Sequence, residues 1–335
     1  MNADPSRAGQ RFAAVIVNYN GGSMLSECVR SCLGEGIPPA RIAVVDNGSS
    51  DGSAEDLGKQ ISGLRLLLNR CNAGFARAAN QGINQGIRQT DAEFVLLLNN
   101  DARLERGALR AFAEGFDKRP KMAIAGGQLR YPDGRLQSAF APLPSLAEEL
   151  IALPLLRLLK PNRFRRKALM SGPMAVESVF GACFCVRTAF LPRLGLLDED
   201  YFFFFEEIEW CQRARLMGLE VWYLPSARAE HGGGATANRF RGRARVEYQR
   251  SKLTFFRKTR NRPSYLVVSV FLVLRTFINA LACAVGSAAT LFLNRKVRLK
   301  AATYWYLFFW HLLLRPTQWG LPGKCPQETL GPSSK

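Results

Sequence analysis

The sequence predicts an α/β protein built on a doubly wound, mostly parallel sheet, followed by a helical tail. One observation behind the sheet is that short apolar runs alternate with segments of helical spacing through the first half of the chain. Another is that several of these runs end in polar residues. The tail is predicted because the chain becomes strongly basic, and then almost wholly apolar, from about residue 240.

Each expected strand of the first half is short and nearly continuously apolar, which is typical of a strand buried on both faces of a parallel sheet. The expected strands are FAAVIV at 12–17, IAVVD at 42–46, LRLLL at 64–68, FVLLLNND at 94–101 and MAIAGGQLRY at 122–131. Helical spacing fills the segments 24–33, 53–61 and 75–87 between them. This alternation indicates parallel strands joined by helical crossovers.

The middle of the chain, residues 138–178, shows little periodicity. It contains several prolines and the basic run KPNRFRRK, so we expect a long, partly helical excursion that forms a mobile loop over the site. Regular structure is expected to return with strands at 179–186 and 219–225 and with a helix at 205–218.

These changes divide the chain into three regions. Residues 1–10 are expected to be a disordered N-terminus, residues 11–240 the α/β domain, and residues 241–335 a basic, apolar helical membrane-association region. The tail includes an uncharged stretch of 19 residues at 276–294, close to the length that crosses a bilayer. Basic segments flank it on both sides, so the charge distribution assigns no orientation. We therefore favour helices that lie in or dip into the cytoplasmic leaflet, with a spanning helix and a bundle packed on the α/β domain as alternatives.

The composition indicates in which cell compartment the protein is located and which binding partners it favours. The formal net charge of +19 favours anionic partners such as phosphates, nucleic acid or an anionic membrane surface. The eight cysteines show no zinc-site spacing, and we expect buried, reduced thiols in a cytoplasmic protein. No apolar stretch precedes Arg11, so no signal peptide is predicted.

The stretch FFFFEEIEWCQR at 202–213 places carboxylates directly after four phenylalanines. At 100° per residue, Glu207 falls in the middle of an apolar stripe, whereas Glu209 lies on the far side, four residues before Arg213. The stripe contains Trp210, Cys211, Ala214, Met217 and Gly218. Glu206 suits the first turn of a helix through the helix dipole. Desolvation raises the pKa of a carboxylate at an apolar wall, which is the condition that a general base needs.

Three further motifs place polar side chains after strands. LLLNND delivers Asp101 to the carboxyl end of the sheet, where open α/β sheets bind ligands. VVDNGSSDGS ends a strand in Asp46 before a glycine- and serine-rich turn, and AEHGGGAT places His231 before flexible glycines. For the first motif a turn or a helix cap is the structural alternative, because Asn and Asp are common at both.

Taken together, these pieces resemble family 2 glycosyltransferases of the GT-A fold, especially the rhamnosyltransferase-like branch. The motifs that carry the resemblance, in the family's order, are VIVNYNGGSMLSECVRSCL, VVDNGSSDGS, NAGFARAANQGI, LLLNND, GACFCVRTAFLPRLGLLDEDYFFFFEEIEWCQRARLMG and VWYLPSARAEHGGGAT. They cover roughly residues 11–240. The resemblance implies an inverting transfer of a sugar from a nucleoside-diphosphate donor to an acceptor hydroxyl.

The resemblance also implies roles for individual residues. Asp46 would contact the base or ribose of the nucleotide, helped by Tyr19 and the neighbouring start of the VNYN motif. The full set implied for nucleotide-sugar binding is Asn18, Tyr19, Asp46, Asn80, Asn99 and Asn100. Asp101 would hold Mg²⁺ or Mn²⁺ on the diphosphate, and His231 would lie near that metal.

Glu207 falls where the family places its base. The sequence departs from the family pattern twice: the metal motif is NND rather than D-x-D, and the base position reads Glu206-Glu207 rather than Glu-Asp. The helical stripe favours Glu207 over Glu206.

The partners implied are a dTDP- or UDP-linked sugar donor, with rhamnose favoured, and a polyprenyl-linked or polysaccharide acceptor in bacterial cell-surface glycan synthesis. The expected location is the cytoplasmic face of the inner (plasma) membrane, peripheral or re-entrant.

Two other functions would account for parts of the sequence. A sugar-phosphate nucleotidyltransferase shares the layout and the metal chemistry, but NYNGGSML lacks the basic residue expected in its loop after the first strand. A basic nucleic-acid- or membrane-binding protein without catalysis would explain the charge. The charge clusters beside an apolar tail, however, and recognised RNA-binding aromatic motifs are absent, so no nucleic-acid partner is expected.

Overall fold

The structure is a computed structural model that describes residues 8–87, 90–151, 153–159, 172–233 and 240–326. These residues form two compact units. The first comprises the described residues within 1–143, 160–234 and 323–335, and the second those within 144–159 and 235–322. Residues 144–159 therefore belong to the second unit and residues 323–326 to the first. A single boundary near residue 240 would assign both segments the other way round.

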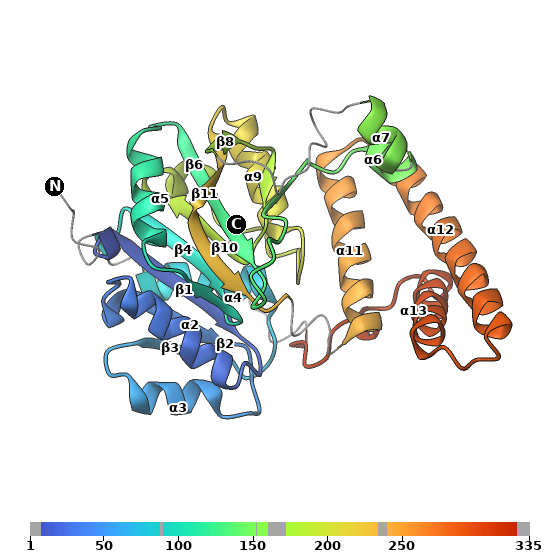
Figure 1. Ribbon diagram of the computed structural model, residues 1–335, viewed down its shortest axis with the longest axis horizontal. Helices are drawn as coiled ribbons and strands as arrows, with labels where there is room; N and C mark the ends of the chain where they lie inside the picture. Colours follow the sequence, from blue (N-terminus) through green and yellow to red (C-terminus); the bar gives the residue numbers. More distant parts are fainter. Residues whose placement is uncertain (1–7, 88–89, 152, 160–171, 234–239, 327–335) are drawn as a thin grey trace. The chain divides into compact units, whose positions relative to one another are not determined.

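The first unit is built on one nine-stranded sheet (Figure 1). Its order is β3-β2-β1-β4-β10-β6-β11-β5, with β8 paired to β11. The strands are β1 (Phe12–Asn18), β2 (Ile42–Asp46), β3 (Arg65–Leu68), β4 (Phe94–Asn99), β5 (Ala102–Leu104), β6 (Met122–Arg130), β8 (Met174–Ala175), β10 (Cys183–Arg187) and β11 (Glu220–His231). The short strands β7 (Phe140–Ala141) and β9 (Ser178–Val179) pair separately.

Four of the eight strand pairings in the sheet are parallel, and they include the two longest, β6 with β11 and β1 with β4. β1 pairs in parallel with both β2 and β4, and β2 with β3, whereas β10 is antiparallel to β4 and β6. β6 and β11 are parallel again, and β5 closes the edge antiparallel to β11. The prediction of a doubly wound, mostly parallel sheet is therefore confirmed.

The helices of the first unit are α2 (Ser23–Gly34), α3 (Ser53–Gln60), α4 (Phe75–Gln81), α5 (Ala108–Asp117), α8 (Leu191–Leu194) and α9 (Glu206–Leu216). Of these, α2, α4, α5 and α9 pack on strands of the sheet, whereas α3 packs on α2 and α8 on α9. Apolar side chains dictate this arrangement: every residue of β2 is buried, as are all but one of β1. The expected helix at 75–87 begins as α4 and continues as the π-helical segment η2 (Gly82–Ile87). A Cβ on Gly82 would lie 2.5 Å from Val15, so only glycine permits this close approach to the sheet.

The second unit is helical. It contains α6 (Leu146–Leu150), α7 (Leu153–Leu159), α11 (Arg241–Thr259), α12 (Arg262–Ala289) and α13 (Arg295–Leu312). The Asn261 side chain caps α12 by accepting a hydrogen bond from Ser264 N, and Asn294 caps α13 in the same way. Glu149 of α6 is buried and forms an ion pair of 2.6 Å with Lys252 of α11. The basic run at 160–167 lies outside the described residues.

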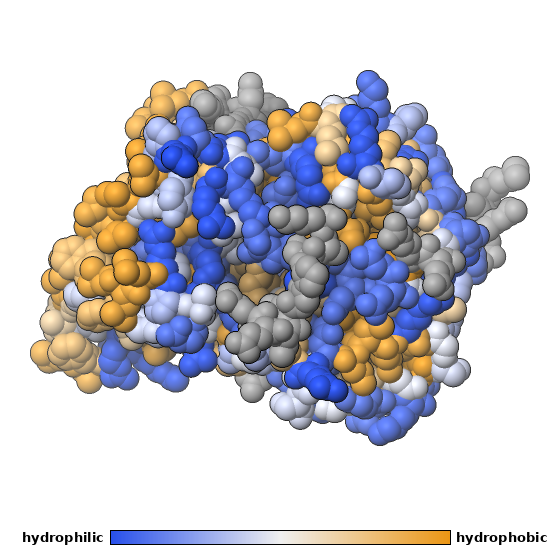
Figure 2. All heavy atoms as spheres, turned by 180° about the vertical axis from the view of Figure 1, so that it is seen from behind, coloured by the Kyte–Doolittle hydropathy of each residue, from blue (hydrophilic) through white to orange (hydrophobic). Residues whose placement is uncertain are grey.

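The outer surface of α12 and α13 is apolar. Exposed large side chains recur along α12 at helical spacing, among them Leu266, Val270, Leu274, Ile278 and Val285. Figure 2 shows apolar side chains gathered over this part of the surface, at the left of the view.

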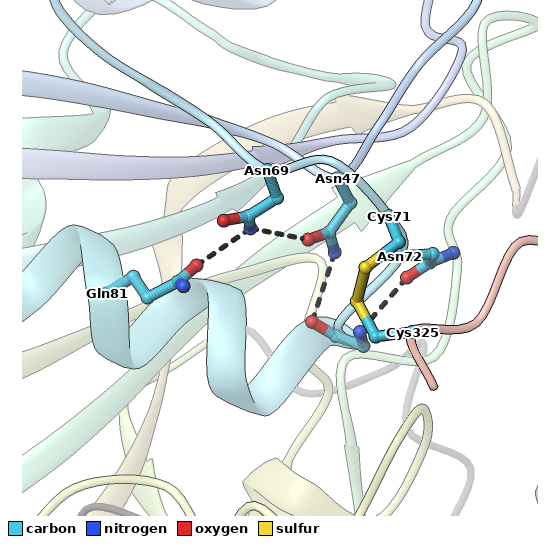
Figure 3. The surroundings of a disulfide bond; sticks show 7 residues. Asn47, Asn69, Cys71, Asn72, Gln81 and Cys325 are labelled. Atoms are coloured by element: carbon cyan, nitrogen blue, oxygen red, sulfur yellow. Dashed lines mark hydrogen bonds between the residues drawn. A yellow bond between two sulfur atoms is a disulfide. The ribbon is translucent and has the colours of Figure 1, made fainter. Parts of the chain in front are cut away.

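The expectation that all cysteines are reduced is wrong for one pair. Cys71 and Cys325 form a disulfide across 254 residues, with their Cα atoms 5.0 Å apart. The other six cysteines are free, and five of them are buried, as expected. The disulfide joins the loop after β3 to the segment 323–326 (Figure 3), a pairing that no local sequence pattern reveals.

Candidate active site

Polar side chains gather at the carboxyl edge of the sheet, because three neighbouring parallel strands end there in polar residues. β1, β2 and β4 end in Asn18, Asp46 and Asn99, and Asn18 lies directly beside Asp46 in the strand register. Open α/β sheets bind ligands at this edge.

A chain of hydrogen bonds connects three of the predicted nucleotide-binding residues. Asn100 Nδ2 donates to Asn18 Oδ1 at 2.8 Å, and Asn18 Nδ2 donates to Asp46 Oδ1 at 2.7 Å. Asn18 is fully buried and Asp46 nearly so. A Cβ on Gly21 would lie 2.3 Å from Asn18 Oδ1, so glycine is required where the chain passes this network.

Asp46 organises the turn that follows β2. Its carboxylate accepts hydrogen bonds from Ser49 N at 2.8 Å and from Ser49 Oγ at 2.6 Å. Ser49 Oγ in turn accepts a hydrogen bond of 2.8 Å from Asn20 N, which ties this turn to the one after β1. The carboxylate thus fixes the two turns that border the edge of the sheet.

The structure does not bring Asn80 to this group. Its Nδ2 donates to Leu197 O at 2.8 Å and to Glu199 at 3.1 Å, and its Oδ1 accepts from Leu197 N. The side chain is 1% exposed, and it anchors the segment that leads to the phenylalanine run. Asn99 contributes backbone contacts: its N donates to Ala182 O at 3.0 Å.

Sequence reasoning missed the residues that lie beside Tyr19. A Cβ on Gly323 would lie 2.8 Å from Tyr19 Oη, and Gly323 has φ +73°, so this position suits only glycine. Asn72 holds the same segment from both sides, because its N donates to Gly323 O at 2.8 Å and its O accepts from Cys325 N at 3.1 Å. Lys324 Nζ lies 4.2 Å from the centre of the Phe202 ring. Figure 3 shows Asn72 beside the disulfide that secures this segment.

An amide network supports the loop that carries Cys71 (Figure 3). Asn69 Nδ2 donates to Asn47 Oδ1 at 3.0 Å and to Gln81 at 2.8 Å, and Asn47 Nδ2 donates to Gly74 O at 3.1 Å. The turn after β2, the loop after β3 and the start of α4 are therefore held as one piece.

The structure brings together Asp101 and His231, the two residues to which the resemblance assigns a metal. His231 Nε2 lies 3.4 Å from Asp101 Oδ1, because β5 and β11 pair immediately beside them with His231 opposite Ala102. Gln137 Oε1 lies 3.0 Å from His231 Nδ1, which orients the ring. His231 Nε2 is buried and has no hydrogen-bond partner among the described residues.

These two side chains suit a divalent cation. Carboxylate oxygens are the preferred ligands of Mg²⁺, and an imidazole nitrogen with a free lone pair suits Mn²⁺ and similar ions. Within the described residues no cluster of three or more His, Cys, Asp or Glu side chains is placed to hold a metal. A cation here would therefore take its remaining ligands from a bound diphosphate and water.

Glu206 and Glu207 begin α9 and are both buried. Glu207 Oε1 accepts a hydrogen bond of 3.3 Å from Gly181 N, whereas Oε2 of each glutamate has no partner among the described residues. Burial raises the pKa of Glu207 to about 7, and burial together with the neighbouring Glu207 raises the pKa of Glu206 well above its usual range. Glu209 instead pairs with Arg213 at 2.7 Å, as the helical spacing predicted.

Glu207 and Asp101 belong to the same edge of the sheet. The segment Gly181–Ala182 links them: Gly181 N donates to Glu207, and Ala182 O accepts from Asn99 N, two residues before Asp101. The buried Glu207 carboxylate and the Asp101–His231 pair are thus connected through one short stretch of backbone.

The model of the family described as "Glycosyltransferase like family 2" matches residues 9–265, more than half of the chain. The chain belongs to glycosyltransferase family 2. The match covers the whole edge of the sheet described above, including Asp46, Asp101, Glu207 and His231, and the chain is therefore a glycosyltransferase. The alternative of a nucleotidyltransferase and that of a non-catalytic binding protein are set aside.

Two relatives of this glycosyltransferase are sugar transferases by name. An N-acetylglucosaminyl-diphospho-decaprenol L-rhamnosyltransferase of Mycobacterium tuberculosis is 27% identical over 228 residues, which cover 65% of this chain and 74% of the relative. The low-salt glycan biosynthesis hexosyltransferase Agl10 of Haloferax volcanii is 24% identical, covering 78% of this chain and 81% of the relative. The predicted rhamnosyltransferase-like branch is confirmed.

Solved structures confirm the predicted GT-A fold. The Pyrobaculum calidifontis mannosyltransferase PcManGT, in complex with GDP-Man and Mn²⁺, matches with a TM-score of 0.52 at 16% identity and covers 91% of this chain and 86% of its own. GalNAc-T7, solved with UDP, GalNAc and Mn²⁺, matches with a TM-score of 0.50 at 17% identity. The match covers 66% of this glycosyltransferase and 43% of GalNAc-T7.

Proposed function

We propose that this glycosyltransferase transfers a sugar, with inversion, from a nucleoside-diphosphate donor to a hydroxyl of a lipid-linked or polysaccharide acceptor in bacterial cell-surface glycan synthesis. The observation that carries the proposal is the buried Glu207, whose Oε2 has no partner among the described residues, on the same edge of the sheet as Asp101 and His231. Rhamnose from a dTDP-linked donor is the favoured sugar, because the Mycobacterium tuberculosis relative is an L-rhamnosyltransferase.

Glu207 acts as the general base. It removes the proton from the acceptor hydroxyl as the oxygen attacks the sugar carbon, a contribution worth about 10²–10⁴-fold in rate. Its raised pKa of about 7 suits this role, since the carboxylate is then basic enough to accept a proton at neutral pH. Gly181 N fixes one carboxylate oxygen and leaves the other for the hydroxyl.

Asp101 and His231 would hold a divalent cation, Mg²⁺ or Mn²⁺, at the place where the donor's diphosphate binds. When bound, such an ion neutralises the negative charge that develops on the departing diphosphate. Gln137 keeps the His231 ring in place, and the β5–β11 pairing keeps Asp101 beside it. Asn18, Asp46 and Asn100 order the turns that receive the nucleotide, with Tyr19 beside them.

A donor screen tests the proposal. Purified full-length protein is incubated with dTDP- and UDP-linked sugars and a soluble glycan as the acceptor, and nucleoside diphosphate release is measured with and without a chelator. We expect release with one donor class, its loss on chelation, and its recovery when Mg²⁺ or Mn²⁺ is returned. Release of pyrophosphate in place of nucleoside diphosphate, or activity unaffected by the chelator, contradicts the proposed chemistry.

We further propose that the second unit attaches the enzyme to the cytoplasmic face of the plasma membrane. Of the helices within the described residues, α12 alone is long and apolar enough to cross a bilayer. Basic residues flank it at Arg262 and at 295–300, which favours a helix lying in one leaflet with cations at lipid phosphates. Washing membrane fractions with high salt and then with carbonate tests this: a peripheral protein is released, whereas a spanning one is retained.

A further inference from the structure

We infer that a small pocket in the second unit binds the phosphate groups of a polyprenyl-diphosphate lipid, and so provides a docking site for the acceptor. The pocket has a volume of about 160 Å³, and the residues that line it include Arg250, Thr254, Arg257, Tyr265, Trp310 and Arg315. The inference rests on the proposed function only in the identity of the lipid as acceptor.

The pocket is cationic. Arg250 is neutralised by Glu247, whose fully buried carboxylate accepts hydrogen bonds of 2.8 and 2.9 Å from Arg250 Nη1. Arg257 is exposed and has no partner among the described residues, and Arg315 has only a hydrogen bond of 3.3 Å to Tyr265 Oη. Two positive charges, those of Arg257 and Arg315, therefore remain for a ligand. They can balance the negative charge of a diphosphate. Guanidinium groups also suit phosphate oxygens geometrically.

The fold holds the pocket in shape. Arg250 Nη2 donates to Pro316 O at 3.0 Å and to Thr317 O at 3.3 Å, which secures the chain that follows α13. Arg315 N donates to Trp310 O at 2.9 Å, and Leu314 and Arg315 both have positive φ. This helix end turns the backbone so that Arg315 lines the pocket beside Trp310. Arg250 is thus a positioning residue, and the ligand-binding cations are Arg257 and Arg315.

A second feature identifies the ligand as a lipid. Leu312, Leu313 and Leu314 immediately precede Arg315, and their exposed fractions are 56, 58 and 91%. Three consecutive exposed leucines beside a phosphate-sized cationic pocket suit a molecule that carries its phosphates on an apolar chain. A soluble phosphate would use the arginines alone, and a bulk anionic headgroup would need no pocket.

Vesicle binding by the full-length protein tests the inference. The probes are phosphatidylcholine vesicles that contain decaprenyl diphosphate, and vesicles that contain phosphatidylserine at the same surface charge. We expect the wild-type protein to prefer the diphosphate vesicles about tenfold. R257Q, which changes an exposed side chain, and R257Q/R315Q should lose this preference. The matched control R295Q/K296Q removes the same charge from the first turn of α13 and should keep the preference while weakening binding to both vesicles.

Three outcomes overturn the inference: equal wild-type binding to the two vesicles, a preference retained in R257Q/R315Q, or inorganic diphosphate in solution binding as tightly as the lipid. Thermal melting shows whether the variants fold. If R257Q/R315Q does not fold, the vesicle preference of R257Q alone tests the docking site. Failure here is distinguishable from failure of the proposed function, because the donor screen offers the sugar to the hydroxyl of a soluble glycan and requires no lipid. A protein that releases nucleoside diphosphate but shows no vesicle preference refutes the docking site only.

Discussion

His231 Nε2 and Asp101 Oδ1 face each other at 3.4 Å, held there by the pairing of β5 with β11. The geometry leaves the imidazole nitrogen without a hydrogen bond among the described residues, although the ring is largely buried. A buried acceptor is costly to leave unpaired, so a ligand that both atoms share is the simplest physical reason for this arrangement.

We expect Asp101→Asn to lower turnover by about 10²-fold or more, because an amide oxygen is a poorer ligand for a divalent cation. Binding of Mn²⁺ in the presence of nucleoside diphosphate, followed by electron paramagnetic resonance, should weaken in parallel. Asp133→Asn is a suitable control, since Asp133 is exposed and forms an ion pair of 2.7 Å with nearby Arg135. Unchanged Mn²⁺ binding in Asp101→Asn would remove Asp101 from the site.

Glu207→Gln should retain donor binding and lose turnover by about 10²–10⁴-fold, because glutamine cannot accept the proton. In the wild-type enzyme kcat should fall as the pH drops below about 7, the pKa of Glu207, since only the carboxylate form is a base. Glu209→Gln is the matched control, because Glu209 lies on the opposite side of α9 and binds Arg213. Transfer by Glu207→Gln at the wild-type rate would reject the assignment.

Because Glu207 is buried with a raised pKa, we expect its replacement by glutamine to stabilise the folded protein at high pH. The pKa of Glu207 is higher in the folded state than in the unfolded state, so the folded protein binds more protons between these values and loses stability as the pH rises from about 4.5 to 7. Glu207→Gln should therefore raise the free energy of unfolding by about 1–3 kcal/mol at pH 8 and by much less at pH 4.5. Denaturant unfolding at the two pH values measures the difference.

Asn80→Ala should destabilise the first unit by about 1–3 kcal/mol, because Leu197 N and O would lose their buried partners. The affinity for the nucleotide should not change, since the Asn80 amide is directed at Leu197 and Glu199. Asn18→Ala provides the comparison: it breaks the link to Asp46 and should weaken both stability and nucleotide binding. Isothermal titration with the nucleoside diphosphate separates the two variants, and a loss of affinity in Asn80→Ala alone would contradict this interpretation.

Cys325→Ser should lower the free energy of unfolding by about 2–4 kcal/mol under oxidising conditions, because the disulfide restricts a long loop of the unfolded chain. Cys283→Ser is the control, since Cys283 is a free and partly exposed thiol. Mass spectrometry after thiol alkylation should count six reactive cysteines in the denatured wild-type protein before reduction and eight after it. Eight before reduction would show that the pair is not joined.

Local hydrophobic patterns in the sequence predicted the strands whose residues are most completely buried. β1, β2 and β4 appear at nearly the expected residues because a strand buried on both faces must be apolar throughout. Helical spacing also placed Glu207 inward, as observed, and paired Glu209 with Arg213, although the Glu209 side chain is only 14% exposed. The β5 strand escaped prediction because it has only three residues and depends on pairing with β11 across more than a hundred residues.

The site was predictable where the chain itself brings residues together, and unpredictable where distant segments meet. Asp46 and Asn18 end neighbouring strands, so their proximity followed from the sheet alone. The contact of Gly323 with Tyr19 depends on a segment some 300 residues away, for which no periodicity exists. Asn80 carries a polar side chain in a family motif, yet its bonding partners at Leu197 and Glu199 are visible only in three dimensions.

The return of residues 323–326 to the first unit bears on how shortened versions of the enzyme should be designed. A fragment that stops near residue 240 looks like a natural way to obtain the α/β domain free of its apolar helices. Such a fragment would lack the segment that hydrogen-bonds to Asn72, the Gly323 neighbour of Tyr19, and Cys325 of the disulfide. A version in which the helices are excised and the final segment is rejoined by a linker would keep them.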